Sequence, residues 1–515
     1  MKNIFIAALI IISIAACSEE QLPVETVSYD KIIRGGTIHD GLGSAGVIGD
    51  VAINGDRIVA VGDLGTATGT EEIDASGLVV SPGFVNMLSH SMRNLIHDPR
   101  GMSELKQGVT MEIFGEGTSM GPLNEQMRQA QTEQQGDIKF DISWTTLGDY
   151  LSFMEDKGIS PNIASFIGAT TARINEIGYE NRLPTEEELV RMQQLVIDAM
   201  NEGALGVGSS LIYAPASYSD TNELVALNKA ASVCGGSYIS HLRSEGNLVD
   251  EAIDELITIA READIPAEIY HLKAAGKDNW DKMDPIIERI EQARADGLKI
   301  TADMYSYTAG ATGLDAMIPP WIQEGGINGW TANMQNPELR AKALGEMRDP
   351  NSEWENLGSG SGYENVITVG FKNPELRHLI GKTLLEISEM RGTSPEDTAM
   401  DLVIEDNSRV GTIYFMMSEE NIKKKLALPW VSFGSDAGAQ APEGLFLNTS
   451  THPRAYGNFS RVLGKYVRDE KVLTLSDAVR RMSSLPASNL KLKDRGVMAT
   501  GYYADLAIFD ASEIA

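Results

Sequence analysis

Cysteine is almost absent from this chain of 515 residues, which contains only Cys17 and Cys234. A disulfide framework of the kind that holds small secreted domains together is therefore excluded. Aromatic residues are also scarce, at 6% of the sequence, but hydrophobic residues make up 42%. A chain of this length can bury a large core without cross-links, so we expect one large domain with an accessory module. We expect Cys234 to pack in the core as a small residue.

Positive charge is the second deficit, because 43 basic residues against 73 acidic ones leave a net charge of −30. The acidic excess is spread along the chain rather than gathered in a tail, which argues against nucleic acid as a partner. Long apolar runs are also lacking. The run from Ile4 to Ala16 is the longest, and it is too short to span a membrane.

The first seventeen residues are typical of a processing signal, with Lys2 as a positive start before the apolar run. They end in Ile14-Ala15-Ala16-Cys17, which resembles a bacterial lipobox. We therefore expect residues 1–17 to be a lipoprotein signal peptide and the mature chain to be lipid-anchored through Cys17. This places the protein on the periplasmic side of the bacterial cell envelope. An ordinary signal peptide or an uncleaved anchor is the alternative.

Beyond a polar linker at residues 18–28, short β-type runs fill residues 29–79. Asn54-Gly55 separates two of them, and this pair tolerates positive φ at both central positions of a tight turn, so it predicts a hairpin. We expect a small antiparallel β module here. Residues 491–515 return to a β-type run at Tyr502 to Asp510, which we expect to pair with the module and complete a split β-sandwich domain.

Residues 80–490 alternate apolar strands with amphipathic helices, a pattern that requires a parallel sheet covered by helices. Eight candidate strands predict an α/β fold, a (β/α)8 TIM-type barrel with its active site at the carboxyl ends of the strands. They are Leu78 to Ser89, Val109 to Phe114, Ile163 to Ile167, Leu205 to Ser209, Ser237 to His241, Ala267 to His271, Ile300 to Tyr305 and Trp430 to Gly434. Residues 308–428, before the last strand, are expected to form an insertion over the barrel mouth.

Two of the seven histidines, His241 and His271, fall at the ends of consecutive predicted strands. In a barrel both imidazoles would point into the same mouth, close enough for one Zn²⁺ to bridge them. The last strand leads into Asp436, whose carboxylate can take a proton from water at a metal and return it to a leaving amine. Each residue alone has a structural alternative, such as a satisfied strand-end histidine or a helix-capping aspartate. Together they predict a hydrolytic metal site.

Several motifs resemble those of the amidohydrolase superfamily. They are Gly83-Phe84 after Ser81-Pro82, the two strand-end histidines, Gly434-Ser435-Asp436, and Gly501 to Leu506. A finer set resembles the N-acyl-D-amino-acid deacylase (D-aminoacylase) branch. It comprises Leu211 to Tyr218, His271-Leu272-Lys273, Gly381 to Leu384, His452 to Gly457 and Ser484 to Ala487. The resemblance extends from about Tyr29 to the last residue.

The resemblance implies that His241 and His271 are zinc ligands and that Asp436 is the catalytic base and later the acid. The substrate-binding residues that it implies are Tyr213, Lys273, Tyr305 and Tyr307. An ammonium group at Lys273 also makes chemical sense, because an acylated amino acid keeps its carboxylate but loses its amine charge. A rim lysine in water is the alternative.

Two positions depart from the family pattern. The superfamily usually ends its first strand with Asp-x-His-x-His, but here Leu88, which cannot ligate zinc, stands two residues before His90. Where D-aminoacylases carry a ligating cysteine, this chain has Glu116 between two glycines, and a carboxylate also binds Zn²⁺. We therefore expect one tightly bound zinc ion, held by His241, His271 and Glu116, with His90 as a further candidate. A purely structural loop role for Glu116 and a fortuitous His90 are the alternatives.

The predicted activity is zinc-dependent hydrolysis of the N-acyl amide bond of N-acyl-D-amino acids, which releases a carboxylate and a D-amino acid. Two alternatives remain: a cyclic-amide or dipeptide hydrolase on the same scaffold, and a non-catalytic lipoprotein that binds a small molecule. The family normally continues with further strands after the run Ala504-Asp505-Leu506, so we expect the β domain to be incomplete in this sequence.

Overall fold

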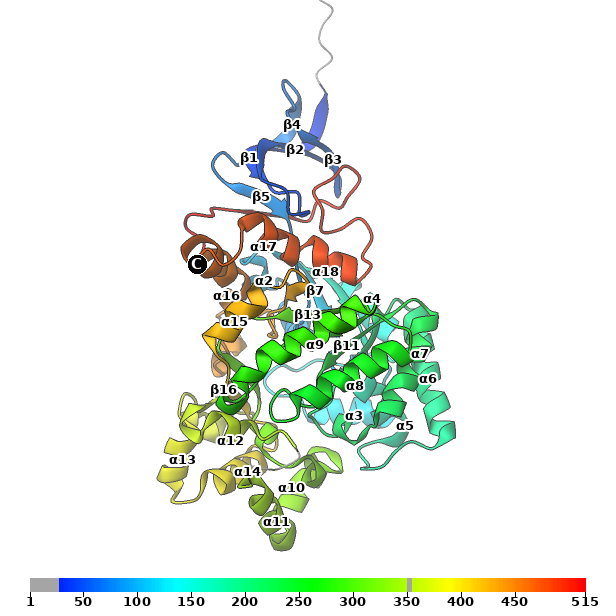
Figure 1. Cartoon of the computed structure of the whole chain (residues 1–515), viewed down its shortest axis with the longest axis vertical. Coiled ribbons are helices and arrows are strands. Elements are labelled where there is room, and N and C mark those ends of the chain that lie inside the picture. Colours follow the sequence, from blue (N-terminus) through cyan, green and yellow to red (C-terminus); the bar gives the residue numbers. More distant parts are fainter. Residues whose placement is uncertain (1–26, 350–353) are drawn as a thin grey trace, which may run out of the picture.

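The computed structural model describes residues 27–349 and 354–515, which form three parts along the long axis of the molecule (Figure 1). The small β domain lies at one end, the barrel in the middle and the insertion at the other end. The leader and Cys17 lie outside the described residues. Among the helices of the described part, none is both long enough and apolar enough to cross a membrane.

Eight parallel staves form the barrel, which confirms the predicted TIM-type fold. They are β6 (Phe84–Asn86), β7 (Val109–Phe114), β8 (Asn162–Ser165) with its continuation β9 (Ile167–Gly168), β10 (Gly206–Ser210), β11 (Ser237–His241), β12 (Ala267–Ile269), β13 (Ile300–Met304) and β17 (Val431–Phe433). The ring closes between β17 and β6, where the amide of Met87 donates to the carbonyl of Phe433 at 3.2 Å.

Amphipathic helices cover the barrel because each buries one apolar stripe on the strands. In α8 (Val249–Glu262), Ile253, Leu256 and Ile257 recur at helical spacing and are buried. The other main covering helices are α5 (Ala169–Ile177), α6 (Glu186–Asn201), α7 (Thr221–Val233), α9 (Met283–Ala295), α15 (Glu419–Leu426) and α17 (Leu475–Met482).

The small domain is one six-stranded sheet that folds over itself. Its strands are β1 (Ser28–Ile38), β2 (Val47–Asn54), β3 (Arg57–Gly62), β4 (Thr68–Asp74), β5 (Val79–Pro82) and β18 (Leu506–Phe509). The predicted hairpin is confirmed, but its central residues are Gly55 and Asp56 rather than Asn54 and Gly55, because Asn54 pairs with Arg57. Strand β18 pairs with β5 as expected for a split domain. The prediction of a wholly antiparallel module is wrong, because the long β1 pairs in parallel with β4 along its first half and with β5 along its second.

Two predicted strands are broken in the structure. The run at 78–89 divides at Gly83 into β5 of the small domain and β6 of the barrel, because the amide of Gly83 donates to the carbonyl of Asp505 and the next amide, of Phe84, donates to the carbonyl of Gly108. The run at 163–167 divides at Phe166, where the amide turns to the carbonyl of Phe114. The predicted core position of Cys234 is also wrong, because this residue is exposed where α7 ends.

The insertion has a hydrophobic core of its own, which includes Met317, Leu384, Val403 and Tyr414. It contains a sheet of β14 (Ala309–Gly313), β15 (Val366–Gly370) and β16 (Gly411–Phe415), with α10 (Gly326–Gln335), α11 (Pro337–Met347), α12 (Leu357–Ser361), α13 (Leu384–Arg391) and α14 (Pro395–Asp406). Because β14 follows barrel strand β13 after only four residues, the sheet of the insertion stands directly over the barrel mouth.

Candidate metal centre

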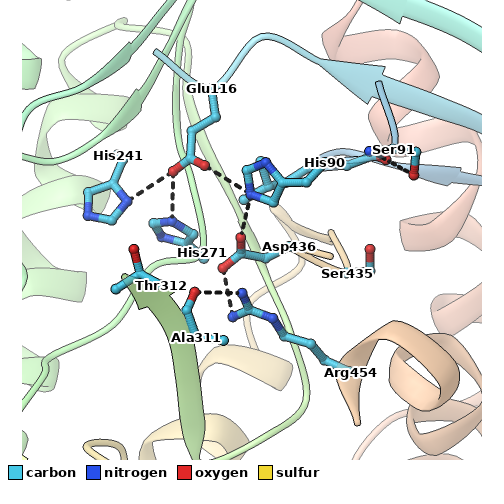
Figure 2. A network of polar contacts seen from close by, with 12 residues as sticks. His90, Ser91, Glu116, His241, His271, Ala311, Thr312, Ser435, Asp436 and Arg454 are labelled. Atoms are coloured by element: carbon cyan, nitrogen blue, oxygen red, sulfur yellow. Dashed lines mark hydrogen bonds and ion pairs between the residues drawn. The ribbon is translucent and has the colours of Figure 1, made fainter. Parts of the chain in front are cut away.

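Five side chains from five strand ends converge in one cavity of about 440 Å³ (Figure 2). His90 follows β6, Glu116 follows β7, His241 ends β11, His271 follows β12 and Asp436 follows β17. Parallel strands in a barrel end at the same rim, so residues more than 300 positions apart in sequence meet there. The five residues are those that the sequence singled out for metal binding and proton transfer.

The carboxylate of Glu116 lies at the centre of the group. Its Oε1 lies 2.9 Å from Nδ1 of His241 and 3.3 Å from Nε2 of His271, and its Oε2 lies 3.2 Å from Nε2 of His90. His90 Nε2 is in turn 2.9 Å from Oδ1 of Asp436. The ligand-type atoms form two sets that share Glu116, one with both strand-end histidines and one with His90 and Asp436.

The backbone is left-handed at two of these residues, with φ of 37° at His271 and 51° at Asp436. Residues other than glycine adopt this conformation at a cost and need surrounding contacts to hold it. The amide of His271 donates to the carboxylate of Asp303 at 3.0 Å, and the amide of Asp436 donates to the carbonyl of Leu88 at 2.9 Å. Neighbouring strands therefore hold both functional side chains at the angle that points them inward.

Glycines let the loop that carries Glu116 pass close to the barrel wall. Gly115 and Gly117 have φ of 107° and 68°, and a side chain at Gly208 of β10 would lie 2.1 Å from the carbonyl oxygen of Gly115. A larger residue at Gly208 would push the loop outward. The small residues thus set how far Glu116 reaches into the cavity.

Glu245, which no motif in the sequence indicated, contacts both imidazoles. Its Oε1 is 2.9 Å from Nδ1 of His271 and 2.7 Å from Nζ of Lys273, and its Oε2 is 3.5 Å from Nε2 of His241. A carboxylate in this position fixes the tautomer and orientation of a metal-binding histidine. Its only sequence signal is its place four residues after His241.

Arg454 was also missed as a separate group. Its Nη1 lies 2.7 Å from Oδ2 of Asp436, another of its nitrogens donates to the carbonyl of Ala311 at 3.1 Å, and its guanidinium lies 4.6 Å from the ring centre of Tyr305. The sequence contained it only as part of the motif at residues 452–457. The ion pair with Asp436 crosses from the loop after β17 to the start of α16 (Arg454–Arg461).

Of the predicted substrate-binding residues, Tyr213, Lys273 and Tyr305 line the cavity. Lys273 is 3% exposed and pairs with Glu245, so it is a buried cation rather than a rim lysine in water. Tyr307 is not among the residues that line this cavity. Its ring instead packs edge-on against His452 at 5.4 Å and beneath the guanidinium of Arg461 at 4.8 Å.

The carboxylates of the site favour the protonated, positively charged forms of His90 and His271. Burial lowers the pKa of His90, but Asp436 and Glu116 outweigh it and raise that pKa to about 10. Burial and Lys273 lower the pKa of His271, but Glu245 and Glu116 raise it to about 9. Burial opposes ionisation of Glu116, yet the three surrounding imidazoles hold its pKa well below the usual range.

The donor set fits a zinc ion, because zinc prefers imidazole nitrogen and carboxylate oxygen in groups of three or four. The ligand-type atoms of Glu116, His241 and His271 all lie within 4.8 Å of one another, and Glu245 completes the second layer behind them. The second set offers one imidazole only, because Leu88 is fully buried against Gly434 where the superfamily pattern has a histidine. The first set is therefore the stronger candidate.

The amino-acid sequence is similar to those of known proteins. The sequence pattern of the amidohydrolase family matches residues 378–515. A D-aminoacylase of Alcaligenes xylosoxydans xylosoxydans is 31% identical over 95% of this chain and 89% of its own length. The chain belongs to the D-aminoacylase family of amidohydrolases.

Solved structures of D-aminoacylase-family proteins agree with this assignment. A D-aminoacylase with a binuclear metal centre, for which one-metal activation and second-metal attenuation are described, has a TM-score of 0.77 and 30% identity, covering 94% of this chain and 90% of that one. An N-acyl-D-glutamate deacylase from Bordetella bronchiseptica, complexed with zinc and a phosphonate inhibitor, has a TM-score of 0.78 and 27% identity over 95% and 91%. The present protein is thus a metal-dependent amidohydrolase of the D-aminoacylase branch.

Proposed function

We propose that this protein hydrolyses the N-acyl amide bond of N-acyl-D-amino acids with zinc held by Glu116, His241 and His271. The observation that carries the proposal is the Glu116 carboxylate, which gathers both strand-end imidazoles on one oxygen and His90 on the other, beside Asp436. The relatives include a D-aminoacylase, an N-acyl-D-glutamate deacylase and an N-acyl-D-aspartate deacylase, and these activities support the choice of substrate class.

Zinc at such a site acts as a Lewis acid toward the acyl carbonyl and lowers the pKa of water. His241 Nδ1, His271 Nε2 and Glu116 Oε1 are the atoms that would hold it. We expect one tightly bound ion, because the second set of groups contains a single imidazole. His90 is a weaker ligand candidate, and its contact with Asp436 gives it a second role in orienting that carboxylate.

Asp436 is the proton-transfer residue in this proposal. Burial would raise its pKa, but Arg454 and the hydrogen bond from His90 outweigh burial and lower it below the usual value. The carboxylate is therefore ionised at neutral pH and able to accept the proton of an attacking water. It then donates that proton to the departing nitrogen, since an amine is a poor leaving group without protonation.

Two buried cations flank Tyr305 and are suited to the α-carboxylate of the substrate. Lys273 and Arg454 are 3% and 2% exposed, and each is paired with one carboxylate of the protein. An acylated amino acid carries a carboxylate and no ammonium, so its recognition requires cations rather than anions. Tyr213 and Tyr305 line the same cavity and offer hydroxyl groups to the amide.

The test combines metal analysis with a panel of N-acetyl-D- and N-acetyl-L-amino acids. We expect about one zinc per chain and cleavage of the D-series. Asp436→Asn should keep its zinc and lose roughly 10²- to 10⁴-fold in kcat, the usual contribution of a positioned acid-base group. Protein that contains no zinc and cleaves no amide would contradict the proposal and favour a binding lipoprotein, and a fully active Asp436→Asn would remove Asp436 from the reaction.

We also propose that the mature chain is anchored to the bacterial envelope through a lipid on Cys17. The support is the sequence of the first seventeen residues alone. In a bacterial host, a labelled fatty acid should be incorporated into the wild-type chain and not into Cys17→Ser. Equal labelling of both chains, or of neither, would contradict the anchor without affecting the enzymatic proposal.

A further inference from the structure

A second cavity, of about 530 Å³, opens onto the metal centre. It and the first cavity share five lining residues, which are His90, Ala311, Thr312, Gly411 and Asp436. A volume of this size is typical of a small-molecule site. Because the shared wall includes the proposed acid-base residue, a group attached to either side of the scissile amide can extend into the second cavity.

The walls of the second cavity are basic, although the chain as a whole has a net charge of −30. Four cationic side chains and two carboxylates line it: Arg93, Lys372, Arg377 and Arg454 against Asp137 and Asp436. Apolar side chains from the insertion and from the loop after β17 complete the wall, among them Phe371, Leu445 and Phe446. The cavity therefore combines a positive field with apolar surface, which suits a negatively charged group on a short carbon chain.

Arg93 differs from the other three cations because it has no partner among residues 27–349 and 354–515. Arg377 binds Asp137 through two contacts of 2.8 and 2.9 Å, and Arg454 is paired with Asp436. Lys372 donates to the side chain of Gln134 at 3.3 Å. Arg93 lines the cavity three residues after His90, but no described residue accepts a hydrogen bond from its guanidinium or forms an ion pair with it.

We propose that Arg93 binds a second carboxylate of the substrate, one in addition to the α-carboxylate. This inference rests on the proposed amide hydrolysis and narrows its substrate class to N-acyl amino acids with two acidic groups. A planar guanidinium with free donors binds a carboxylate through two parallel hydrogen bonds, so the second cavity selects for charge as well as shape. The second carboxylate is located either on the amino-acid side chain or at the far end of the acyl group.

The experiment uses two matched pairs of substrates on the zinc-loaded full chain. N-acetyl-D-glutamate and N-acetyl-D-glutamine differ by one charge on the side chain, and N-succinyl-D-leucine and N-butyryl-D-leucine differ by one charge on the acyl group. We expect the wild-type enzyme to prefer the charged member of one pair in kcat/KM, and that pair identifies the location of the second carboxylate.

Arg93→Gln should lower kcat/KM for the preferred charged substrate by roughly tenfold to a hundredfold, the range for a lost charge-assisted hydrogen bond. The neutral member should change by no more than about twofold, and Arg93→Lys should recover part of the preference because it restores the charge. Lys229→Gln is the matched control. Lys229 is exposed on α7 and lines neither cavity, so this variant changes the net charge equally without altering the site.

Cleavage of the neutral substrates without any charge preference would overturn the role of Arg93 and leave the proposed function standing. An equal loss on charged and neutral members in Arg93→Gln would also overturn it, because it would show a structural role. Failure of the zinc-loaded wild type to cleave any of the four substrates would overturn the proposed function, and the inference with it.

Discussion

Glu245 offers the sharpest test of how the metal centre is built, because it contacts both histidines among the zinc-ligand candidates and also a buried lysine. Glu245→Gln keeps the size of the side chain and one acceptor oxygen but removes the negative charge. Two effects should follow. Lys273 loses the partner that neutralises it at 2.7 Å, and the imidazole of His271 loses the carboxylate that fixes its tautomer at 2.9 Å.

The first effect is a loss of folding free energy and the second is a loss of zinc affinity, so the two are measured separately. Lys273 and Glu245 are each 3% exposed, and breaking a buried ion pair from one side costs about 3 to 5 kcal/mol of folding free energy. Loss of a carboxylate behind a metal-binding histidine typically lowers metal affinity about 10- to 100-fold. That corresponds to about 1.4 to 2.7 kcal/mol of binding free energy.

The assay is a double-mutant cycle of Glu245→Gln and Lys273→Met. The free energy of unfolding is measured by urea in the presence of a chelator, so that zinc binding does not contribute, and zinc affinity is measured separately by competition with a chromogenic chelator. We expect the double variant to regain most of the lost stability, since no unpaired charge remains. Its zinc affinity should stay low, because the carboxylate behind His271 is still missing.

Two results would refute this reasoning. Unchanged zinc affinity in Glu245→Gln would show that Glu245 does not position His271. A double variant as unstable as Glu245→Gln alone would show that the cost does not arise from the unpaired ammonium of Lys273.

Three further predictions concern the surroundings of the site. Gly208→Ala should weaken zinc binding and cost about 1 to 3 kcal/mol of stability, because the added methyl group would push against the carbonyl of Gly115. Gly345→Ala, where the added methyl group lies in open space, should do neither, and equal zinc affinity in the two variants would contradict the prediction. Asp303→Ala should lower the zinc content, because it removes the acceptor that holds the left-handed backbone at His271. Asp303→Asn keeps an acceptor and should keep its zinc, so an equal loss of zinc in both variants would contradict the prediction. Burial raises the pKa of Glu268 to about 7, so the folded state holds a proton that the unfolded state releases near pH 4.5, and stability falls as pH rises between these values. Glu268→Gln should therefore gain up to about 3 kcal/mol over wild type between pH 5 and pH 8 in urea unfolding, and a pH-independent difference would contradict the assignment.

Much of the barrel was predictable because its signal is local. Apolar strands and amphipathic helices each show their period within ten to fifteen residues, and a parallel barrel places every strand end on one rim. This is why His241, His271 and Asp436 were expected together before any contact was known. The same reasoning failed at Gly83 and Phe166, because an unbroken apolar run does not reveal where a strand leaves one sheet and enters another.

The second layer of the site was not predictable in the same way. Glu245 and Arg454 are ordinary charged residues in sequence, and their roles depend on which neighbours the loops bring near them. The same is true of Tyr307, whose ring packs against His452 and Arg461, and of Arg93, for which none of the described residues is a hydrogen-bond or ion-pair partner.

The amino-acid sequence by itself determined the alternation of strands and helices, the eight staves, the split small domain and the residue types at the strand ends, since these follow from side-chain periodicity and turn chemistry. Only the tertiary structure decided that one carboxylate, Glu116, joins three histidines. It also decided that Arg377 and Arg454 are paired with carboxylates, whereas Arg93 has no such partner among the residues that the structure describes. The physical reason is that charge pairing acts over a few ångströms. Those distances are set by loops that join residues hundreds of positions apart, and the path of such loops depends on the packing of the whole fold.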